Sequence, residues 1–139
     1  MIVKAAKTNT DLKAAIFVRG QVFVNEFGMN KDEVFDDLDD KSLILVGFEG
    51  LTPVATCRVL VKNDTSYISK LCVMPNKRNQ GLGSMMLKSA EKRTLDEFDF
   101  VKRFQVAPIL DSIIFLEKNG YSFEFGNVEL GANMQKKVI

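Results

Sequence analysis

Residues 71–84 read Leu-Cys-Val-Met-Pro-Asn-Lys-Arg-Asn-Gln-Gly-Leu-Gly-Ser, and this stretch decides how the chain is organised. The apolar residues at its start favour a strand, and Pro75 ends that strand because proline has no N–H to donate to a sheet. A basic pair follows, and then Gly81 and Gly83 precede an apolar pattern of helical spacing. The sequence therefore predicts a strand, a glycine-rich loop and a helix in direct succession.

This loop has the properties of a site for a diphosphate. Glycines let a backbone approach an anion closely. The first amides of a helix have no internal partner, and the helix dipole favours negative charge beside them. Lys77 and Arg78 add cationic donors. We therefore expect a phosphate-bearing ligand here.

Two common nucleotide-binding loops do not fit. A Walker A loop requires Gly-x-x-x-x-Gly-Lys-Ser/Thr, which is absent from the sequence. A Rossmann loop requires a third small residue, but Gly81-Leu82-Gly83 is followed by Ser-Met-Met. A third pattern, Arg/Gln-x-x-Gly-x-Gly/Ala, is satisfied in full by residues 78–83.

The rest of the chain alternates between strand and helix patterns. Strands are expected over 2–6, 42–48, 54–61, 66–74, 103–107, 121–125 and 132–138. Helices are expected from a cap within Thr8-Asn9-Thr10 to about Gly28, over 82–98, and from Pro108 or Asp111 to Lys118, with a polar loop at 30–41. On the first helix, Leu12, Ala15, Ile16, Val22 and Phe23 are expected to form the apolar face. This order predicts an α/β or α+β fold with a mixed sheet, as a single domain over residues 1–139.

Composition excludes several classes of protein. The 139 residues contain 46% hydrophobic and 27% charged residues, and 19 Lys and Arg balance 18 Asp and Glu, so no strongly basic nucleic-acid-binding surface is expected. No apolar run is long enough to span a bilayer. The absence of histidine excludes Ser-His-Asp triads and His-ligated zinc. Two cysteines, Cys57 and Cys72, indicate reduced thiols in a cytoplasmic protein with no metal site.

The chain resembles the GNAT superfamily of N-acetyltransferases at three separate motifs in the correct order. Residues 78–83 match the superfamily's diphosphate loop, and residues 115–121 (Phe-Leu-Glu-Lys-Asn-Gly-Tyr) resemble its closing signature. Residues 19–26 (Arg-Gly-Gln-Val-Phe-Val-Asn-Glu) resemble a bacterial branch with small-molecule acceptors, in which acidic residues like Glu33, Asp36 and Asp39 follow. The resemblance implies a mixed, mostly antiparallel sheet flanked by about three to four helices, with two splayed central parallel strands.

The resemblance also implies acetyl-CoA as acyl donor and a primary amine of a small molecule or peptide as acceptor, with direct attack in a ternary complex. No nucleic acid, membrane or metal is implied, and a dimer is possible. The pantetheine arm would bond the backbone of 71–73, and the diphosphate would lie on the loop. The implied cofactor-binding residues are Leu71, Cys72, Val73, Arg78, Asn79, Gln80, Gly81, Leu82, Gly83 and Ser84.

Catalytic side chains are harder to assign, because Leu116 stands where many relatives have a tyrosine that protonates the departing thiolate. Glu26 is a candidate base, or a solvated carboxylate at a helix end. Cys72 is a candidate proton donor, or a small buried strand residue. Gln105 is polar in an apolar strand and faces either the acyl group or solvent.

Three further residues are candidates for acceptor binding. Arg19 lies on the apolar face of the first helix and needs a partner, such as Glu26 or an acidic loop residue. Asp36 and Asp39 could recognise a cationic amine or only form turns. Besides an N-acetyltransferase, the sequence leaves open a non-catalytic acyl-CoA-binding module and a small interaction domain whose loop binds another phosphate.

Overall fold

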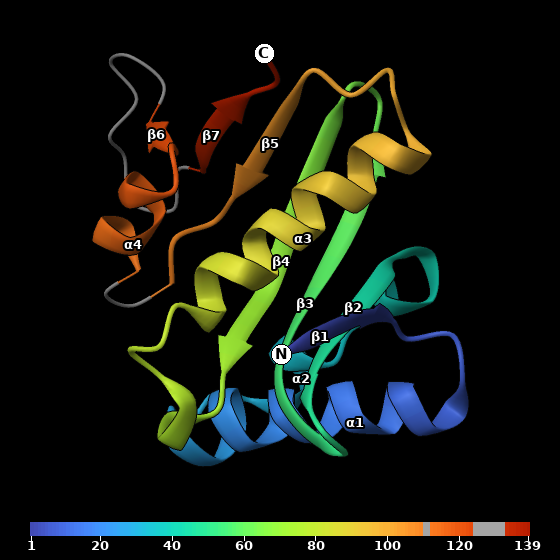
Figure 1. Cartoon of the computed structure of the whole chain (residues 1–139), viewed down its shortest axis with the longest axis vertical. Coiled ribbons are helices and arrows are strands. Elements are labelled where there is room, and N and C mark those ends of the chain that lie inside the picture. Colours follow the sequence, from blue (N-terminus) through green and yellow to red (C-terminus); the bar gives the residue numbers. More distant parts are fainter. Residues whose placement is uncertain (110–111, 124–132) are drawn as a thin grey trace.

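The computed structural model describes residues 1–109, 112–123 and 133–139. Its elements, in order, are β1 (Ile2–Ala5), α1 (Asn9–Arg19), η1 (Gly20–Glu26), α2 (Lys31–Val34), η2 (Asp37–Lys41), β2 (Leu43–Glu49), β3 (Thr52–Lys62), β4 (Thr65–Val73), η3 (Pro75–Lys77), α3 (Leu82–Glu97), β5 (Arg103–Val106), α4 (Ile113–Lys118), β6 (Ser122–Phe123) and β7 (Met134–Lys137). The described strands form one sheet in the order β1-β2-β3-β4-β5-β7-β6 (Figure 1).

The centre of this sheet contains its one parallel pair, β4 and β5. The register joins Thr65 to Arg103 and ends where Ile68 meets Val106, whereas β4 continues to Val73. The last residues of β4 therefore have no neighbour on the β5 side among the described strands. The expected mixed sheet with splayed central parallel strands is confirmed.

A bulge in β4 lies at the point where the two strands separate. Thr56 pairs with Cys72 and Arg58 with Ser69, so Lys70 and Leu71 together oppose one residue of β3. Lys70 has φ 53°, a left-handed conformation that is uncommon outside glycine. The extra residue reverses the alternation, so Leu71 joins the core that contains Ile68 while Cys72 joins the opposite one.

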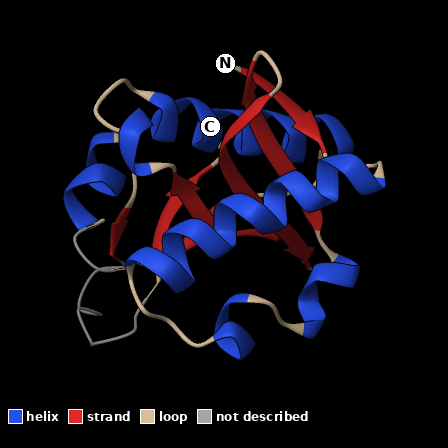
Figure 2. Cartoon of the chain, turned by 90° about the horizontal axis from the view of Figure 1, so that it is seen from below, coloured by secondary structure: helices blue, strands red, loops and turns tan. Residues whose placement is uncertain are grey.

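Helices cover both faces of the sheet (Figures 1 and 2). The amphipathic helix α3 buries Met86, Leu87 and Ala90 against β3 and β4. On the other face, α1 and η1 bury residues at 15, 18, 19, 22 and 23, the spacing of one helical stripe. Packing on both faces holds β4 in place. Beyond Ile68, the end of β4 is unpaired on the side that faces β5.

Several expectations are confirmed and others are wrong. Thr8 caps α1, where its Oγ1 accepts a hydrogen bond of 3.1 Å from the Asp11 amide. Ala15, Val22 and Phe23 are buried as expected, but Ile16 is 51% exposed, because the buried stripe runs through Ala15, Val18 and Val22 and leaves position 16 to one side. The first helix continues through a π-helical segment, η1. The expected loop at 30–41 contains the short helices α2 and η2.

Some expectations fall outside the described residues: the helix start at Asp111 and the strand positions 124, 125 and 132. Within the described ranges, the chain has no helix that is both long and apolar enough to cross a membrane.

Candidate functional site

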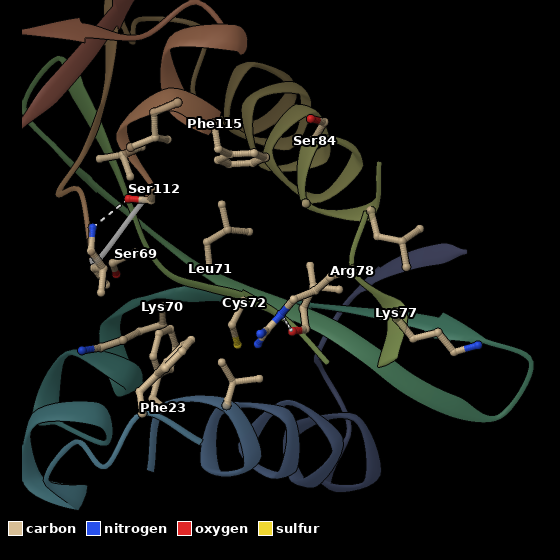
Figure 3. A pocket seen from close by; sticks show the side chains of 18 of the residues that line it. Phe23, Ser69, Lys70, Leu71, Cys72, Lys77, Arg78, Ser84, Ser112 and Phe115 are labelled. Atoms are coloured by element: carbon tan, nitrogen blue, oxygen red, sulfur yellow. Dashed lines mark hydrogen bonds between the residues drawn. The ribbon is translucent and has the colours of Figure 1, made fainter. Parts of the chain in front are cut away.

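A pocket of about 760 Å³ opens where β4 leaves β5 (Figure 3). It passes from the N-terminus of α3 and from α4, on one face of the sheet, to η1 on the other. Its lining residues are Val22, Phe23, Phe27, Ser69, Lys70, Leu71, Cys72, Val73, Lys77, Arg78, Asn79, Gly81, Leu82, Gly83, Ser84, Val106, Ala107, Ile109, Ser112, Phe115 and Leu116.

The glycine loop, residues 78–84, forms the wall of this pocket at the start of α3. Asn79 and Gly81 have φ values of 64° and 79°, and Gly81 caps the helix with no side-chain hydrogen bond. The Gly81 carbonyl accepts from the Met85 amide at 3.1 Å, so the amides of residues 82–84 precede the first helical hydrogen bond. These amides can hold an anion.

The two glycines of this loop have different constraints. A Cβ on Gly83 would lie 3.1 Å from the Phe115 ring of α4, so a side chain there would require that ring to move. A Cβ on Gly81 would meet no atom within 4 Å, and its positive φ is the constraint. Gly83 therefore allows close packing, and Gly81 allows the turn.

The free end of β4 forms a second wall, built of backbone. The Met74 amide donates to the Val54 carbonyl of β3 at 2.8 Å. By the two-residue alternation of the strand beyond the bulge, the amide of Val73 points to the opposite side, into the splay. Of the three residues expected to bond the pantetheine arm, Cys72 has its amide directed toward β3 instead.

Arg78 lines the pocket, but other residues of the protein already hold its guanidinium. Its Nε donates to the Val73 carbonyl at 3.0 Å, and its two terminal nitrogens donate to both oxygens of Glu26 at 2.6 Å. The guanidinium also lies 5.6 Å from the centre of the Phe27 ring. Arg78 thus ties the end of η1 to the end of β4, whereas the resemblance implied a contact with diphosphate.

Glu26 is held in its charged form by the same contact. Hydrogen bonds from Arg78 lower the pKa of its carboxyl group below the ordinary value. A carboxylate bound by both guanidinium nitrogens has little basicity left. This geometry favours a structural role for Glu26 over that of a base.

Cys72 lies against the apolar cluster of Val18, Val22 and Phe23 and is 7% exposed. Figure 3 shows its sulfur on the Phe23 side of β4, opposite Leu71. Burial raises the pKa of the Cys72 thiol well above its ordinary range. A thiol with so high a pKa is a poor acid near neutral pH, which favours the packing interpretation.

Gln105 lies on β5 beside β7, where its Oε1 accepts from Asn133 at 3.1 Å, and it does not line the pocket. Leu116 is buried and lines the pocket, so no phenol is present at that position. Tyr121 is buried and donates to Glu91 at 2.7 Å, as expected for a packing residue.

The acidic segment, residues 30–41, contributes two carboxylates, those of Asp36 and Asp39, to an ion cluster. The cluster's other two members are Arg19 and Arg58. Arg19 donates to both oxygens of Asp39 at 2.9 and 2.8 Å. Arg58 donates to Asp36 at 2.6 Å, to Asp39 at 3.1 Å and to Ser69 at 3.1 Å. Both arginines are buried, with exposed fractions of 1% and 5%.

This cluster identifies the partner of Arg19. It is Asp39, an acidic loop residue, and not Glu26. The hydrogen bond from Arg58 lowers the pKa of Asp36. Both predicted acceptor carboxylates are thus engaged by buried arginines, and neither is among the lining residues of the pocket. This arrangement favours a structural role for them over recognition of a cationic amine.

Among the polar residues of the pocket lining, sequence analysis missed three. Lys70 is the left-handed residue of the β4 bulge, and its Nζ donates to the Glu33 carbonyl at 2.6 Å. Ser69 and Ser112 carry hydroxyl groups in the lining. A lysine inside the predicted strand 66–74 was the one available signal, and a β-bulge has no local pattern that would place it.

Comparison with known proteins agrees with this geometry. The family model described as "Acetyltransferase (GNAT) family" matches residues 15–121. The uncharacterized N-acetyltransferase YjcF of Bacillus subtilis (strain 168) is 30% identical over 118 residues, which cover 84% of this chain and 81% of YjcF. The chain belongs to the GNAT acetyltransferase family, whose members transfer an acyl group from acyl-CoA.

Solved structures share the fold over almost the whole chain. A candidate N-acetyltransferase from Lactobacillus plantarum superposes with a TM-score of 0.85 at 25% identity, covering 99% of this chain and 98% of that one. Tetrahymena GCN5 has a TM-score of 0.81 at 14% identity, covering 100% and 97%. The PaiA N-acetyltransferase of Thermoplasma acidophilum, crystallised with coenzyme A, has a TM-score of 0.72 at 17% identity, covering 99% and 100%.

Proposed function

We propose that this protein transfers an acetyl group from acetyl-CoA to the primary amine of a small molecule or peptide, by direct attack within a ternary complex. One observation carries the proposal: a single pocket joins the unpartnered amides of the glycine loop to the unpaired backbone of β4. An acyl-CoA needs both features, because its diphosphate is an anion and its pantetheine arm is a chain of amides.

The backbone carries most of the proposed chemistry. The amides of residues 82–84 would hold the diphosphate, and Leu71 and Val73 would pair with the pantetheine arm as a strand would. An amide of β4 that points into the splay would polarise the thioester carbonyl and stabilise the oxyanion formed as the amine attacks. The rate gain would then come mainly from orientation of the two reactants.

Side chains have a smaller part in this proposal. Arg78 holds the Val73 carbonyl and Glu26, so the pair would fix the end of β4 against η1. Neither position considered for a proton donor supplies one, because Leu116 has no acidic proton and burial raises the pKa of the Cys72 thiol. We therefore infer that the attacking amine releases its proton to water as the C–S bond breaks, and that the thiolate leaves as the anion or takes a proton from water, since a thiolate is a weak enough base to depart without prior protonation.

Two measurements on the same sample test the proposal. Thermal unfolding with acetyl-CoA and with CoA should show a rise in Tm that grows with ligand concentration, because a ligand that binds only the folded state stabilises it. Transfer is then measured as CoA release with a panel of primary amines. The absence of any shift would overturn the proposal, and a shift without transfer to any amine would favour a non-catalytic acyl-CoA-binding module.

A further inference from the structure

The end of the pocket beside η1 combines an apolar wall with one distinctive cation. We define the acceptor end as Val22, Phe23, Phe27, Ser69 and Lys70, all of which line the pocket. We propose that this end takes a primary amine bearing both an apolar group and a carboxylate, and that Lys70 recognises the carboxylate. This inference rests on the proposed function, and it concerns the class of acceptor.

The charges around the pocket point to Lys70. The pocket has three cationic lining residues among those described, and two of them meet carboxylates: Arg78 meets Glu26, and Lys77 lies 3.0 Å from Glu49. Lys70 instead donates to a main-chain carbonyl, that of Glu33, at 2.6 Å. An ammonium group has three donors, so Lys70 retains two for a ligand.

Lys70 and the ion cluster beside it together carry three positive and two negative charges. In the cluster two arginines meet two carboxylates, and the ammonium of Lys70 adds the third cation. Within the described chain, Nε and Nη2 of Arg19 are buried without a hydrogen-bond partner. Burial, and then the charge of Arg58, lowers the pKa of Lys70. A bound anion would reduce this excess, because opposite charges attract strongly where water is excluded.

The lining also excludes the opposite kind of acceptor. No described lining residue is acidic, and both carboxylates once considered for a cationic amine are bound to Arg19 and Arg58. A polyamine would therefore place a second positive charge near Lys70 with no acidic side chain among the described lining residues to balance it.

The apolar wall sets the other half of the specificity. Val22 and Phe23 are buried, with exposed fractions of 1% and 3%, and Phe27 extends this wall toward solvent. Figure 3 shows the stem of Lys70 beside Phe23, with the ammonium at the far end of the stem from Cys72. An acceptor that covers Phe23 with an apolar group can therefore reach the ammonium with its carboxylate. An amino acid with an aromatic or branched aliphatic side chain has this shape.

Matched compounds that differ only in the carboxylate test this inference. The first pair is L-phenylalanine and 2-phenylethylamine, the second is L-leucine and 3-methylbutylamine, and kcat/KM is compared within each pair. Binding of the products N-acetyl-L-phenylalanine and N-acetyl-2-phenylethylamine to the protein with saturating CoA is measured by calorimetry, which requires no turnover. We expect at least about a tenfold preference for the carboxylate-bearing member.

The variant Lys70→Met keeps an apolar stem and removes the charge. We expect the preference to fall below about threefold through loss of affinity for the carboxylate-bearing product alone. Lys92→Met, at an exposed position of α3 (78% exposed), is the charge-matched control and should keep the wild-type preference. If Lys70→Met does not fold, the decline of the wild-type preference with added salt tests the same charge.

Three results would overturn the inference. The wild-type protein could bind both N-acetyl products equally, or bind neither at about 10 mM, or Lys70→Met could lower the affinity for both products by the same factor. Thermal unfolding with acetyl-CoA, run on the same preparations, separates this failure from a failure of the proposed function. A retained acetyl-CoA shift with any of these results rejects only the carboxylate-bearing acceptor.

Discussion

The two walls of the pocket are built in different ways. The glycine loop and the end of β4 present main-chain groups, with φ values of 64° at Asn79 and 79° at Gly81. The opposite wall, formed by η1 and the bulge, presents side chains such as those of Phe23 and Lys70, and ion pairs between distant residues lie beside it. A wall made of backbone tolerates many different side chains in its sequence. A wall made of side chains depends on the identity of each residue.

This difference separates what the family shares from what distinguishes this chain. Backbone donors suit the acyl donor, whose diphosphate and amides are the same in every reaction. Side chains suit the acceptor, which differs among enzymes of one fold. Substitutions on the two walls should therefore have different consequences, for stability on one and for acyl-CoA affinity on the other.

The largest effect is expected where the acidic segment meets the sheet. Asp39→Ala would leave Arg19, which is 1% exposed, without its carboxylate, and an uncompensated buried charge typically costs about 3–5 kcal/mol. Asp37→Ala, at an exposed neighbour, should change the free energy of unfolding by less than about 0.5 kcal/mol. Urea unfolding measures both. An equal free energy of unfolding in the two variants would mean that the ion cluster does not stabilise the acidic segment on the sheet.

On the backbone wall, the main effect is expected on affinity. Gly81 and Gly50 both have positive φ (79° and 62°), and a Cβ on either would meet no atom within 4 Å. Gly81→Leu and Gly50→Leu should therefore lose a similar stability, about 1–2 kcal/mol each. Only Gly81→Leu should weaken acetyl-CoA binding, by about 100-fold or about 2.7 kcal/mol.

Calorimetry with acetyl-CoA measures this contrast at a temperature where both proteins are folded. A parallel loss of affinity in Gly50→Leu would show that strain alone weakens binding. Unaltered affinity in Gly81→Leu would remove the glycine loop from the acyl-CoA site.

A smaller effect is expected at the contact that joins the two walls. Glu26→Gln should lower kcat/KM for transfer by less than about tenfold, whereas loss of a general base costs about 10²–10⁴-fold. Because hydrogen bonds from Arg78 keep the Glu26 pKa low, its charge is constant above pH 6 and the pH profile should not change. If Glu26 acts through Arg78, the double variant Glu26→Gln, Arg78→Gln should have a kcat/KM no lower than that of Arg78→Gln alone. A 100-fold loss with an altered pH profile would identify Glu26 as the base instead.

The smallest effect is expected at the cysteines. Burial raises the pKa of Cys57 to about 12 and raises that of Cys72 further, so both thiols stay protonated at pH 8. Iodoacetamide should modify neither in the folded protein and both in urea, as measured by mass spectrometry. Cys72→Ala should keep kcat/KM within about threefold, since no proton passes through the thiol. Rapid labelling of Cys72 in the folded state would contradict its burial.

The sequence predicted the backbone wall well because its signals are local. Pro75 ends a strand, Gly81 allows a left-handed turn, and the helix follows within the same fourteen residues. Hydrophobic periodicity likewise predicted the order of strands and helices around this stretch. Periodicity wrongly placed Ile16, the neighbour of buried Ala15, on the buried face. It therefore fixes the direction of a helix face only to within about one residue.

The surroundings of the opposite wall were not predictable, because the ion pairs beside it join residues far apart in sequence. Arg58 bonds Asp36 over 22 residues, and Arg78 bonds Glu26 over 52. From sequence, each of these carboxylates could have faced an acceptor or solvent. The bulge at Lys70 depends on the β3–β4 register, to which no local residue type points.

By itself, the sequence determined the fold class, the family and the loop that opens α3, because each follows from neighbouring residues and from backbone geometry. Only the tertiary structure decided which charges meet. It placed both acidic candidates on buried arginines and left Lys70 as the pocket lysine without a carboxylate among the described residues. The physical reason is that a backbone conformation is set within a few residues, whereas an ion pair forms wherever folding brings opposite charges out of water.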